Sequence, residues 1–488
     1  MFFGAESVLR SFVSTRPGHA AAAAIALGAL AFALFVGLGS APIGRLSEER
    51  CVWVVKRMVE NGQLLVPRFA GKVRLQKPPL FYWAGALVAK RSGDTGPWSV
   101  RAVSAAAALG LAAVVLAWGS TVGGRGEGLV ALGLLAAMQQ ITSSGRRGDA
   151  EMLLAFFSAA ALFCFDRIHA ERRRALLPLF ALLAGLAFLT KATAVFITIA
   201  LPILVALALQ RELRSLRAPS VIATFAGIAA IGVSWYVAIV VLVPGSVESL
   251  REVLLLPLGS ISGHSGSTHF RPPWWYLSVL PGRAAPASLL LPLVVWRLWR
   301  TRVHRGDPHR RFAALAFLVP FAAFSLLPQK QKHYTLPMLA GLALCSADAV
   351  IAAARELAPY FRAALRALGA PLALAGLAAT SLLALFYLWV EAFPLATILA
   401  WSIVPVALFV FGALAALAAR PASFGASWLI GFLLAVGLAR GIVEPRIDYL
   451  SWNFVHLPID DRERLLTLKR EHPWFARIVF AVKMEDSG

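Results

Sequence analysis

Acidic side chains stand at the boundaries of apolar segments in this sequence, where they could act as proton acceptors. Glu48 and Glu49 follow the first apolar segment, and Asp149 precedes the fourth. A carboxylate that is partly shielded from water can have a raised pKa, which suits a general base. We therefore take Glu48, Glu49 and Asp149 as candidate catalytic residues, each able to deprotonate or orient an acceptor hydroxyl.

A second set of boundary residues could bind a phosphate group. Arg clamps a phosphate with two hydrogen bonds, whereas Lys supplies a compact positive charge. Lys191 lies between two apolar segments with no polar loop to solvate it, and such cations are costly and often functional. The candidates for phosphate binding are Lys77, Arg146, Arg147, Lys191, Lys330, Lys332 and Tyr334. His269 is a candidate for contact with an acceptor.

Each of these residues also has an ordinary structural explanation. Acids such as Glu48 favour the first turn of a helix, and Asp149 could cap the helix that follows it. Arg146 and Arg147 could anchor the chain among lipid headgroups. The chemical roles therefore depend on whether the fold brings these residues together.

The composition defines the kind of molecule that must position these groups. The 488 residues are 59% apolar and only 15% charged, and the mean hydropathy is +0.72. Soluble domains are about half apolar and about a quarter charged. These values exclude a disordered chain, a nucleic-acid-binding domain and a secreted disulfide scaffold, and they argue against a soluble enzyme. The sequence predicts an all-α polytopic membrane protein.

Apolar runs of about 20 residues predict membrane-spanning helices. We expect thirteen, near residues 19–41, 98–119, 127–145, 150–166, 175–190, 192–210, 218–243, 283–299, 312–328, 334–354, 368–390, 394–418 and 422–439. Two shorter stretches, 78–89 and 273–280, are rich in Trp and Tyr and predict interfacial helices.

The distribution of positive charge predicts the orientation. The chain has 47 Lys and Arg against 25 Asp and Glu, for a net charge of +22. If the N-terminus is inside, Arg clusters fall on alternate loops, as the positive-inside rule requires. The candidate site residues then share the outer side. We expect a multi-pass protein of the bacterial plasma (inner) membrane with an extracytoplasmic active site.

The domain boundaries follow from this topology. Residues 1–439 are predicted to form the transmembrane domain, with a long first external loop at 42–97. Residues 440–488 mix charged and apolar types and predict an extracytoplasmic amphipathic tail.

Metal-binding patterns are weak. The three cysteines, Cys51, Cys164 and Cys345, are widely spaced and form no metal or disulfide motif. His264 and His269 stand five residues apart in a Gly- and Ser-rich loop, which is a poor metal signature. No cofactor is required by the sequence, and a divalent metal ion stays an open alternative.

The first external loop carries a long motif between residues 47 and 83. It opens with acids, continues through a helix with Gly and Pro, and ends in Lys-Pro-Pro-Leu-x-Tyr-Trp. The residues concerned are Glu48, Arg50, Met58, Gly62, Pro67, Gly71, Lys77, Pro78, Pro79, Leu80, Tyr82 and Trp83. This motif resembles the first external loop of the membrane glycosyltransferases that use polyprenyl-phosphate sugars. That superfamily includes the protein O-mannosyltransferases and the lipid A aminoarabinose transferases.

Four further motifs follow in the order that the superfamily shows. They occupy residues 146–151, 189–193, 269–276 and 329–337. Each is weak alone, but five in order on one predicted face are a strong signal. One position departs from the pattern: the family usually opens with Asp-Glu, and this chain has Ser47-Glu48. Because that Asp is usually assigned the catalytic role, Glu48 or Glu49 replaces it here, or the chain uses a different base.

The resemblance implies a GT-C-like fold and an enzyme that is a glycosyltransferase, either hexosyl or pentosyl. Its donor would be a polyprenyl-monophosphate sugar, and its acceptor lipid A, another envelope glycan or a protein hydroxyl, with inversion at the anomeric carbon. The implied partners are this donor, a lipid or protein acceptor and membrane lipids, with no nucleic acid. The alternatives are a transporter or lipid flippase and a non-catalytic membrane scaffold. Transporters often show internal repeats and charged groups at the midplane, and we find neither in the sequence.

Overall fold

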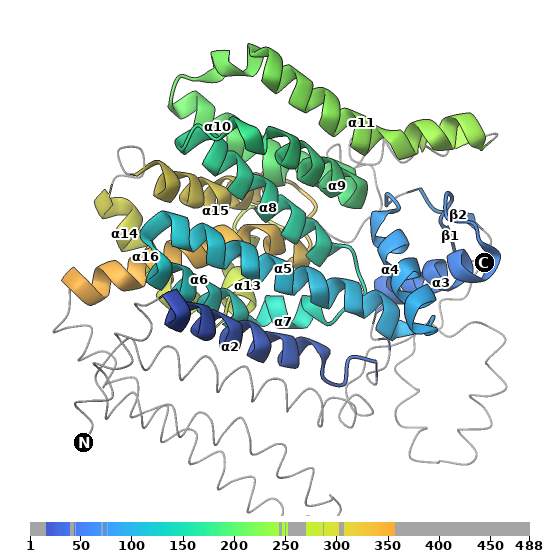
Figure 1. The fold of residues 1–488 in the computed structure, drawn as a ribbon, viewed down its shortest axis with the longest axis horizontal. Coiled ribbons are helices and arrows are strands. Elements are labelled where there is room, and N and C mark those ends of the chain that lie inside the picture. Colours follow the sequence, from blue (N-terminus) through green and yellow to red (C-terminus); the bar gives the residue numbers. More distant parts are fainter. Residues whose placement is uncertain are drawn as a thin grey trace, which may run out of the picture.

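The computed structural model describes residues 16–39, 43, 45–69, 72–75, 77–243, 246–248, 250–251, 270–285, 287–301 and 307–356. They form a bundle of helices with one short hairpin (Figure 1). Several predictions fall on other parts of the chain and lie outside the described residues. They concern His269, the spans near 368–390, 394–418 and 422–439, and the tail 440–488.

The helices follow the apolar segments of the sequence. In chain order the elements are α2 (Arg16–Phe35), α3 (Leu46–Asn61), β1 (Arg68–Phe69), β2 (Lys72–Val73), α4 (Leu80–Ser92), α5 (Pro97–Gly123), α6 (Arg125–Ala137), α7 (Gln139–Gly145), α8 (Glu151–Ala170), η1 (Arg174–Leu176), α9 (Leu177–Val195), η2 (Phe196–Ala200), α10 (Leu201–Leu209), η3 (Leu213–Arg217), α11 (Pro219–Leu242), α13 (Trp275–Arg283), η4 (Ala287–Leu290), α14 (Leu291–Thr301), α15 (Pro308–Leu326), η5 (Lys332–Met338) and α16 (Leu339–Glu356).

Six helices in the described part are long and apolar enough to cross a membrane. They are Pro17–Phe35, Pro97–Gly123, Glu151–Ala170, Arg174–Leu209, Pro219–Leu242 and Lys332–Glu356. A bent pair, Trp275–Arg283 with Ala287–Thr301, raises the number to seven if it is one span. The chain is therefore an integral membrane protein by its helices, while the predicted number of thirteen stays a prediction.

Helix α8 marks two ends of the bundle, because Glu151 is its first residue and His169 stands near its last. We call these the Glu151 end and the opposite end. Trp118, near the end of α5, donates a hydrogen bond to Asp166, near the end of α8, at 2.9 Å. Helices α5 and α8 therefore run in the same direction, and α6 and α7 return the chain between them.

The segment from α9 to α10 reverses direction at Lys191. By length it counts as one apolar helix of 36 residues, but the Lys191 backbone is not helical, with φ −161° and ψ 85°. Lys191 Nζ lies 2.8 Å from Glu151, whereas Glu212, beyond α10, lies 2.8 Å from His169 at the opposite end. The helical residues before Lys191 and those after it, through η2 and α10, thus form a hairpin, in agreement with the two spans predicted on either side of Lys191.

Two details differ from the sequence prediction. The span expected at 127–145 is broken at Met138, whose backbone is extended, with φ −63° and ψ 128°. The first loop also contains a small antiparallel hairpin, in which Arg68 faces Val73 and Phe69 faces Lys72. Strands this short give no alternating pattern in the sequence, so an all-α prediction misses them.

The first loop otherwise folds as expected, into the two helices α3 and α4. Helix α3 ends at Gly62, whose φ of 69° lies in the left-handed region that glycine adopts without strain. Helix α4 starts after Pro78 and Pro79, as the Lys-Pro-Pro motif predicts. Figure 1 shows α3, α4, β1 and β2 grouped at one side of the bundle.

Small residues allow the helices to pack closely. A Cβ atom at Gly119 of α5 would lie 2.9 Å from the Cα atom of Gly128 in α6. At Gly341 of α16 a Cβ atom would lie 2.7 Å from the Phe317 nitrogen in α15. Close backbone contact of this kind drives helix association in lipid, where apolar side chains gain nothing by leaving water.

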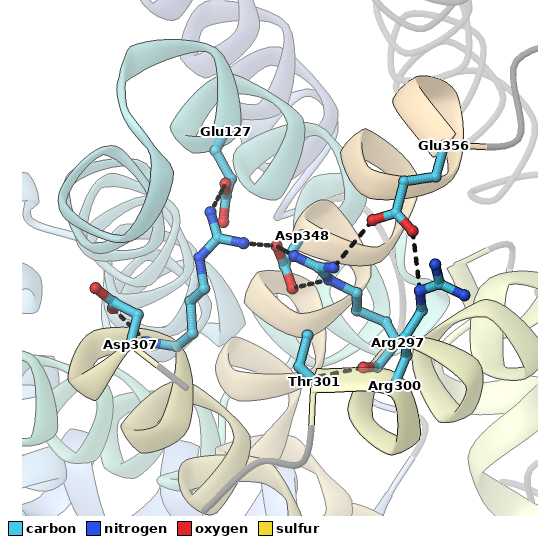
Figure 2. Close-up of polar contacts among 8 residues, drawn as sticks. Glu127, Arg297, Arg300, Thr301, Asp307, Asp348 and Glu356 are labelled. Carbon is cyan, nitrogen blue, oxygen red and sulfur yellow. Dashed lines mark hydrogen bonds and ion pairs between the residues drawn. The ribbon is translucent and has the colours of Figure 1, made fainter. Parts of the chain in front are cut away.

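Charged side chains tie the helices together at the opposite end of the bundle (Figure 2). Arg310 of α15 bridges Asp348 of α16 and the buried Glu127 of α6. Arg297 of α14 donates to Asp348 at 2.9 Å and to Glu356 at 3.4 Å. We call these five residues the Glu127 cluster, and it connects α6, α14, α15 and α16.

Candidate active site

The Glu48 carboxylate lies at the start of α3 and is 4% exposed. Arg101 of α5 donates to it twice, from Nε to Oε1 at 2.7 Å and from Nη2 to Oε2 at 3.3 Å. The backbone N–H of Gly148 donates to Oε1 at 2.9 Å. A buried charge is costly unless it is paired in this way. These donors occupy both oxygens, so Glu48 ties α3 and α5 to the loop that carries Asp149.

Asp149 stands in the loop just before α8 and keeps part of its surface open. Its Oδ1 atom accepts a hydrogen bond from the backbone N–H of Glu151 at 3.2 Å. Ser104 of α5 donates to the Asp149 carbonyl at 3.1 Å, which fixes the loop from the other side. Burial and the nearby Glu151 carboxylate both raise the pKa of Asp149, and Lys77 only partly offsets them. Asp149 thus has the environment of a general base.

The Lys77 side chain, from the segment before α4, lies near the Asp149 carboxylate. Burial alone would lower the pKa of Lys77, but the carboxylates of Glu151 and Asp149 are close enough to raise it above its usual range. The ammonium group therefore stays charged beside Asp149. A lasting positive charge here is what an anionic leaving group needs.

Lys191 meets Glu151 at the break within α9. Its Nζ atom lies 2.8 Å from Oε1 and 3.0 Å from Oε2 of Glu151. The same ammonium lies 5.0 Å from the centre of the Tyr334 ring, and His333 Nε2 lies 3.4 Å from Glu151 Oε1. Because the helix breaks at Lys191, its side chain points across to α8 and η5 instead of along its own helix.

Arg147 adds a guanidinium group next to Asp149. Burial and the charges of Arg45 and Arg283 together lower the pKa of Arg147 to about 10. Three guanidinium groups from the first loop, the α7–α8 loop and α13 therefore share one region. We call Asp149, Glu151, Lys77, Lys191, Arg147, His333 and Tyr334 the Asp149 recess.

Other predicted residues lie elsewhere or have different partners. Arg146 is buried, and its Nη1 atom donates to the carbonyls of Leu34 at 3.0 Å and Val36 at 2.7 Å, at the end of α2. Lys330 donates from Nζ to the carbonyls of Leu327 and Arg271, the latter at 3.0 Å. Both cations cap backbone carbonyls, so the structure does not bring them to the recess as phosphate ligands.

Two more candidates do not join the recess. The Lys332 side chain is exposed, while its carbonyl accepts a hydrogen bond from Thr335 at 2.9 Å. Glu49 is half-buried on α3 and takes no part in the pair between Glu48 and Arg101.

Sequence reasoning did not single out Glu151 or Arg101. Arg101 is a cation inside an apolar span, a position that is costly unless a partner exists, and this signal was available. Glu151 stands two residues after Asp149, where it could pass for a helix-start acid. Only the fold shows that Lys191 meets it, because 40 residues separate the two in the chain.

The donor set does not fit a metal ion. Among the described residues, no group of three His, Cys, Asp or Glu side chains is arranged to hold one. The Glu151 carboxylate in the recess is already paired with Lys191, and Lys77 lies beside both acids. We therefore derive no step through a metal.

Known proteins are similar to the part of this chain that carries the Asp149 recess. The family model of dolichyl-phosphate-mannose-protein mannosyltransferases matches residues 76–237, which include Lys77, Asp149 and Lys191. The undecaprenyl phosphate-alpha-4-amino-4-deoxy-L-arabinose arabinosyl transferase of Yersinia enterocolitica is 26% identical over 338 residues, or 66% of this chain and 58% of that protein. Its counterpart in Aeromonas salmonicida is 27% identical over 348 residues, or 67% and 60%. This chain spans less than two thirds of the length of these curated relatives.

A solved structure shows the same fold. The crystal structure of ArnT from Cupriavidus metallidurans bound to undecaprenyl phosphate is similar with a TM-score of 0.70 and 18% identity. The match covers 88% of this chain and 77% of that one. The fold and the matched segment thus confirm the resemblance to the GT-C-like superfamily of membrane glycosyltransferases that use polyprenyl-phosphate sugars.

Proposed function

We propose that this chain transfers a sugar from a polyprenyl-monophosphate donor to an acceptor hydroxyl in the cell envelope. The observation that carries the proposal is the Asp149 recess, in which one carboxylate with a raised pKa lies beside cations from separate segments. The relatives are named for a 4-amino-4-deoxy-L-arabinose donor, which makes a pentosyl phosphate lipid the first donor to test. Acceptor candidates are lipid A, another glycan or a protein hydroxyl.

In the proposed reaction Asp149 accepts the proton of the acceptor hydroxyl. The hydroxyl oxygen then attacks the anomeric carbon as the bond from that carbon to the phosphate oxygen breaks, with inversion. The polyprenyl phosphate leaves with the electron pair of that bond. Developing charge on the phosphate would be stabilised by Lys77, Arg147 and Lys191. In this proposal the base and the phosphate clamp lie on the same side of the bundle.

Glu48 has a positioning role in this proposal and not the role of the base. Its oxygens already accept from Arg101 and from the Gly148 backbone. Ser47, which stands where the family usually has Asp, cannot act as a carboxylate base. Asp149 is then the carboxylate of the recess with the raised pKa that the chemistry needs.

The orientation follows from the charge pattern. Arg297, Arg300 and Arg310 cluster at the opposite end, and a cytoplasmic position for them would satisfy the positive-inside rule. The Asp149 recess would then face the extracytoplasmic side of a bacterial inner membrane.

The experiment that tests this function uses the purified full chain in detergent. It is incubated with defined undecaprenyl-phosphate sugars and an acceptor glycolipid, and released undecaprenyl phosphate is measured by mass spectrometry. Release that requires the acceptor supports transfer. If no sugar of the pentose and hexose series is transferred by folded protein, the proposal is wrong.

A further inference from the structure

A separate cavity of about 350 Å³ lies on the flank of α3, between the second half of that helix and the segment that follows it. Nine residues separate Arg57, on its rim, from Glu48 along α3, a rise of about 13 Å. The buried side chains of Val54 and Met58 line it, and the half-exposed Trp53 ring lies beside them. A cavity of this volume falls within the range of small-molecule sites.

The far wall of this flank cavity is held by hydrogen bonds from distant helices. The indole N–H of Trp83 in α4 donates to the Leu64 carbonyl at 2.8 Å. The indole N–H of Trp235 in α11 donates to the Leu65 carbonyl, also at 2.8 Å. These contacts fix the segment after Gly62 in place. Ordering this wall would therefore cost little free energy when a ligand binds.

The polar residues of the flank cavity favour an anionic ligand with hydroxyl groups. Its rim carries the guanidinium groups of Arg57 and Arg68 and the amides of Asn61 and Gln63, and no Asp or Glu lines it. Within the described segments neither guanidinium group makes an ion pair with an acid. The nearby Glu60 lies 3.8 Å from Lys56 instead.

The Trp53 ring adds an aromatic platform. It is 43% exposed, and the Arg57 guanidinium carbon lies 5.3 Å from its centre. The Phe69 ring of β1 meets Trp53 edge to face with centroids 6.4 Å apart, which sets the ring orientation. A half-exposed indole offers an apolar surface to a sugar ring, while Arg suits phosphate through two hydrogen bonds.

We propose that the flank cavity binds a phosphorylated saccharide, with the sugar on Trp53 and the phosphate between Arg57 and Arg68. Such a saccharide is either the headgroup of a glycolipid or a soluble sugar phosphate. Both present a sugar ring and a phosphate group to the cavity. The site is distinct from the Asp149 recess and its occupancy does not depend on transfer.

The test is a titration of the detergent-purified full chain with glucose 1-phosphate, in which isothermal calorimetry measures the binding. Glucose and inorganic phosphate are titrated in parallel. Because the Asp149 recess could also bind a sugar phosphate, every titration uses protein that carries Lys77→Gln. The double variant Arg57→Gln/Arg68→Gln and the variant Trp53→Leu should each weaken glucose 1-phosphate binding by at least about tenfold. Arg91→Gln, an exposed cation on α4 outside the cavity, is the matched control and should bind as the parent does.

Several outcomes would overturn the proposal. Binding that is unchanged in both cavity variants, or absent from the parent, would do so. Inorganic phosphate that binds as tightly as glucose 1-phosphate would show that no sugar is recognised. To test whether an anionic phospholipid headgroup fills the cavity instead, the chain is placed in nanodiscs of neutral lipid or of phosphatidylglycerol. Competition by phosphatidylglycerol as strong as that of a phosphorylated glycolipid would assign the cavity to phospholipid headgroups and reject the saccharide.

The result is independent of the proposed transfer reaction. Asp149→Asn, which should stop transfer, should leave this titration unchanged. A chain that binds glucose 1-phosphate in the flank cavity but transfers no sugar would reject the proposed function alone. A chain that transfers sugar without this binding would reject the flank site alone.

Discussion

At the scale of the residue, Asp149 differs from the other acids of the Glu151 end by its partners. Glu48 is paired with Arg101, and Glu151 is paired with Lys191. The Asp149 carboxylate instead accepts a hydrogen bond from the backbone N–H of Glu151. A weakly neutralised carboxylate in a shielded place is the better proton acceptor.

Replacing Asp149 by Asn should reduce kcat for sugar transfer by about 10²–10⁴-fold, the usual contribution of a positioned base. Asn keeps the size and can still accept from the Glu151 N–H, so the thermal unfolding temperature should change little. The matched control is Glu60→Gln, an exposed acid on α3 paired with Lys56, which should retain full activity. An Asp149→Asn protein with parental kcat would remove Asp149 from the mechanism.

The pH profile of kcat/KM should report the raised pKa of Asp149. A base works when it is deprotonated, so activity should fall at low pH, and the fall should begin above the pH of about 4 typical of Asp. Glu151→Gln removes a neighbouring negative charge that raises this pKa, so the acid limb should move to lower pH. An acid limb that moves to higher pH in this variant would contradict the assignment.

At the scale of the element, an ion pair joins α3 to α5, and the Asp149 loop is held to it by the hydrogen bond from Gly148 to Glu48. The start of α3 and the prolines before α4 could be predicted, because acids at a helix start and Pro at a first turn are local signals. The pairing of Glu48 with Arg101 could not, since 53 residues separate them and no local pattern encodes their contact. For the same reason the sequence keeps Glu48 among the candidate bases with Glu49 and Asp149, while in the fold both Glu48 oxygens accept hydrogen bonds.

Removing either partner of this pair should destabilise the protein strongly. Glu48→Gln or Arg101→Met leaves a buried charge unpaired, which costs about 3–5 kcal/mol of unfolding free energy. The double variant should lose less than the sum of the two single losses. A double-mutant cycle in denaturant, with detergent present, measures this coupling. Additive losses would show that the two side chains do not stabilise the loop together.

At the scale of the whole molecule, the residues proposed for catalysis and the Glu127 cluster occupy different ends of the bundle. Asp149 and the cations of the Asp149 recess keep part of their surface open, and the Glu127 cluster ties four helices at the opposite end. The alternation of Arg clusters along the sequence predicted this separation, because each apolar span moves the chain from one end to the other. The break at Met138 and the hairpin of β1 and β2 could not be predicted, since they involve few residues and no periodic pattern.

Arg310→Met should therefore lower stability without altering the chemistry. It leaves Glu127, which is 2% exposed, without its arginine partner, at a cost of about 3–5 kcal/mol of unfolding free energy. Folded Arg310→Met protein should keep the parental KM for the donor, because the substitution lies at the far end. Arg300→Gln is the control: its side chain is 61% exposed, so its pair with Glu356 is worth about 0–1 kcal/mol. Equal losses in both variants would argue against a structural role for the Glu127 cluster.

The reversal at Lys191 has one more consequence. Within α9 the chain reverses at this residue without any intervening loop, so the backbone itself sets the depth of the ammonium group in the bilayer. A headgroup that docks on it stops at that level however long its isoprenoid tail is. Donors with shortened tails should hence place their sugar at an unchanged height, and the number of isoprene units should affect affinity far more than turnover.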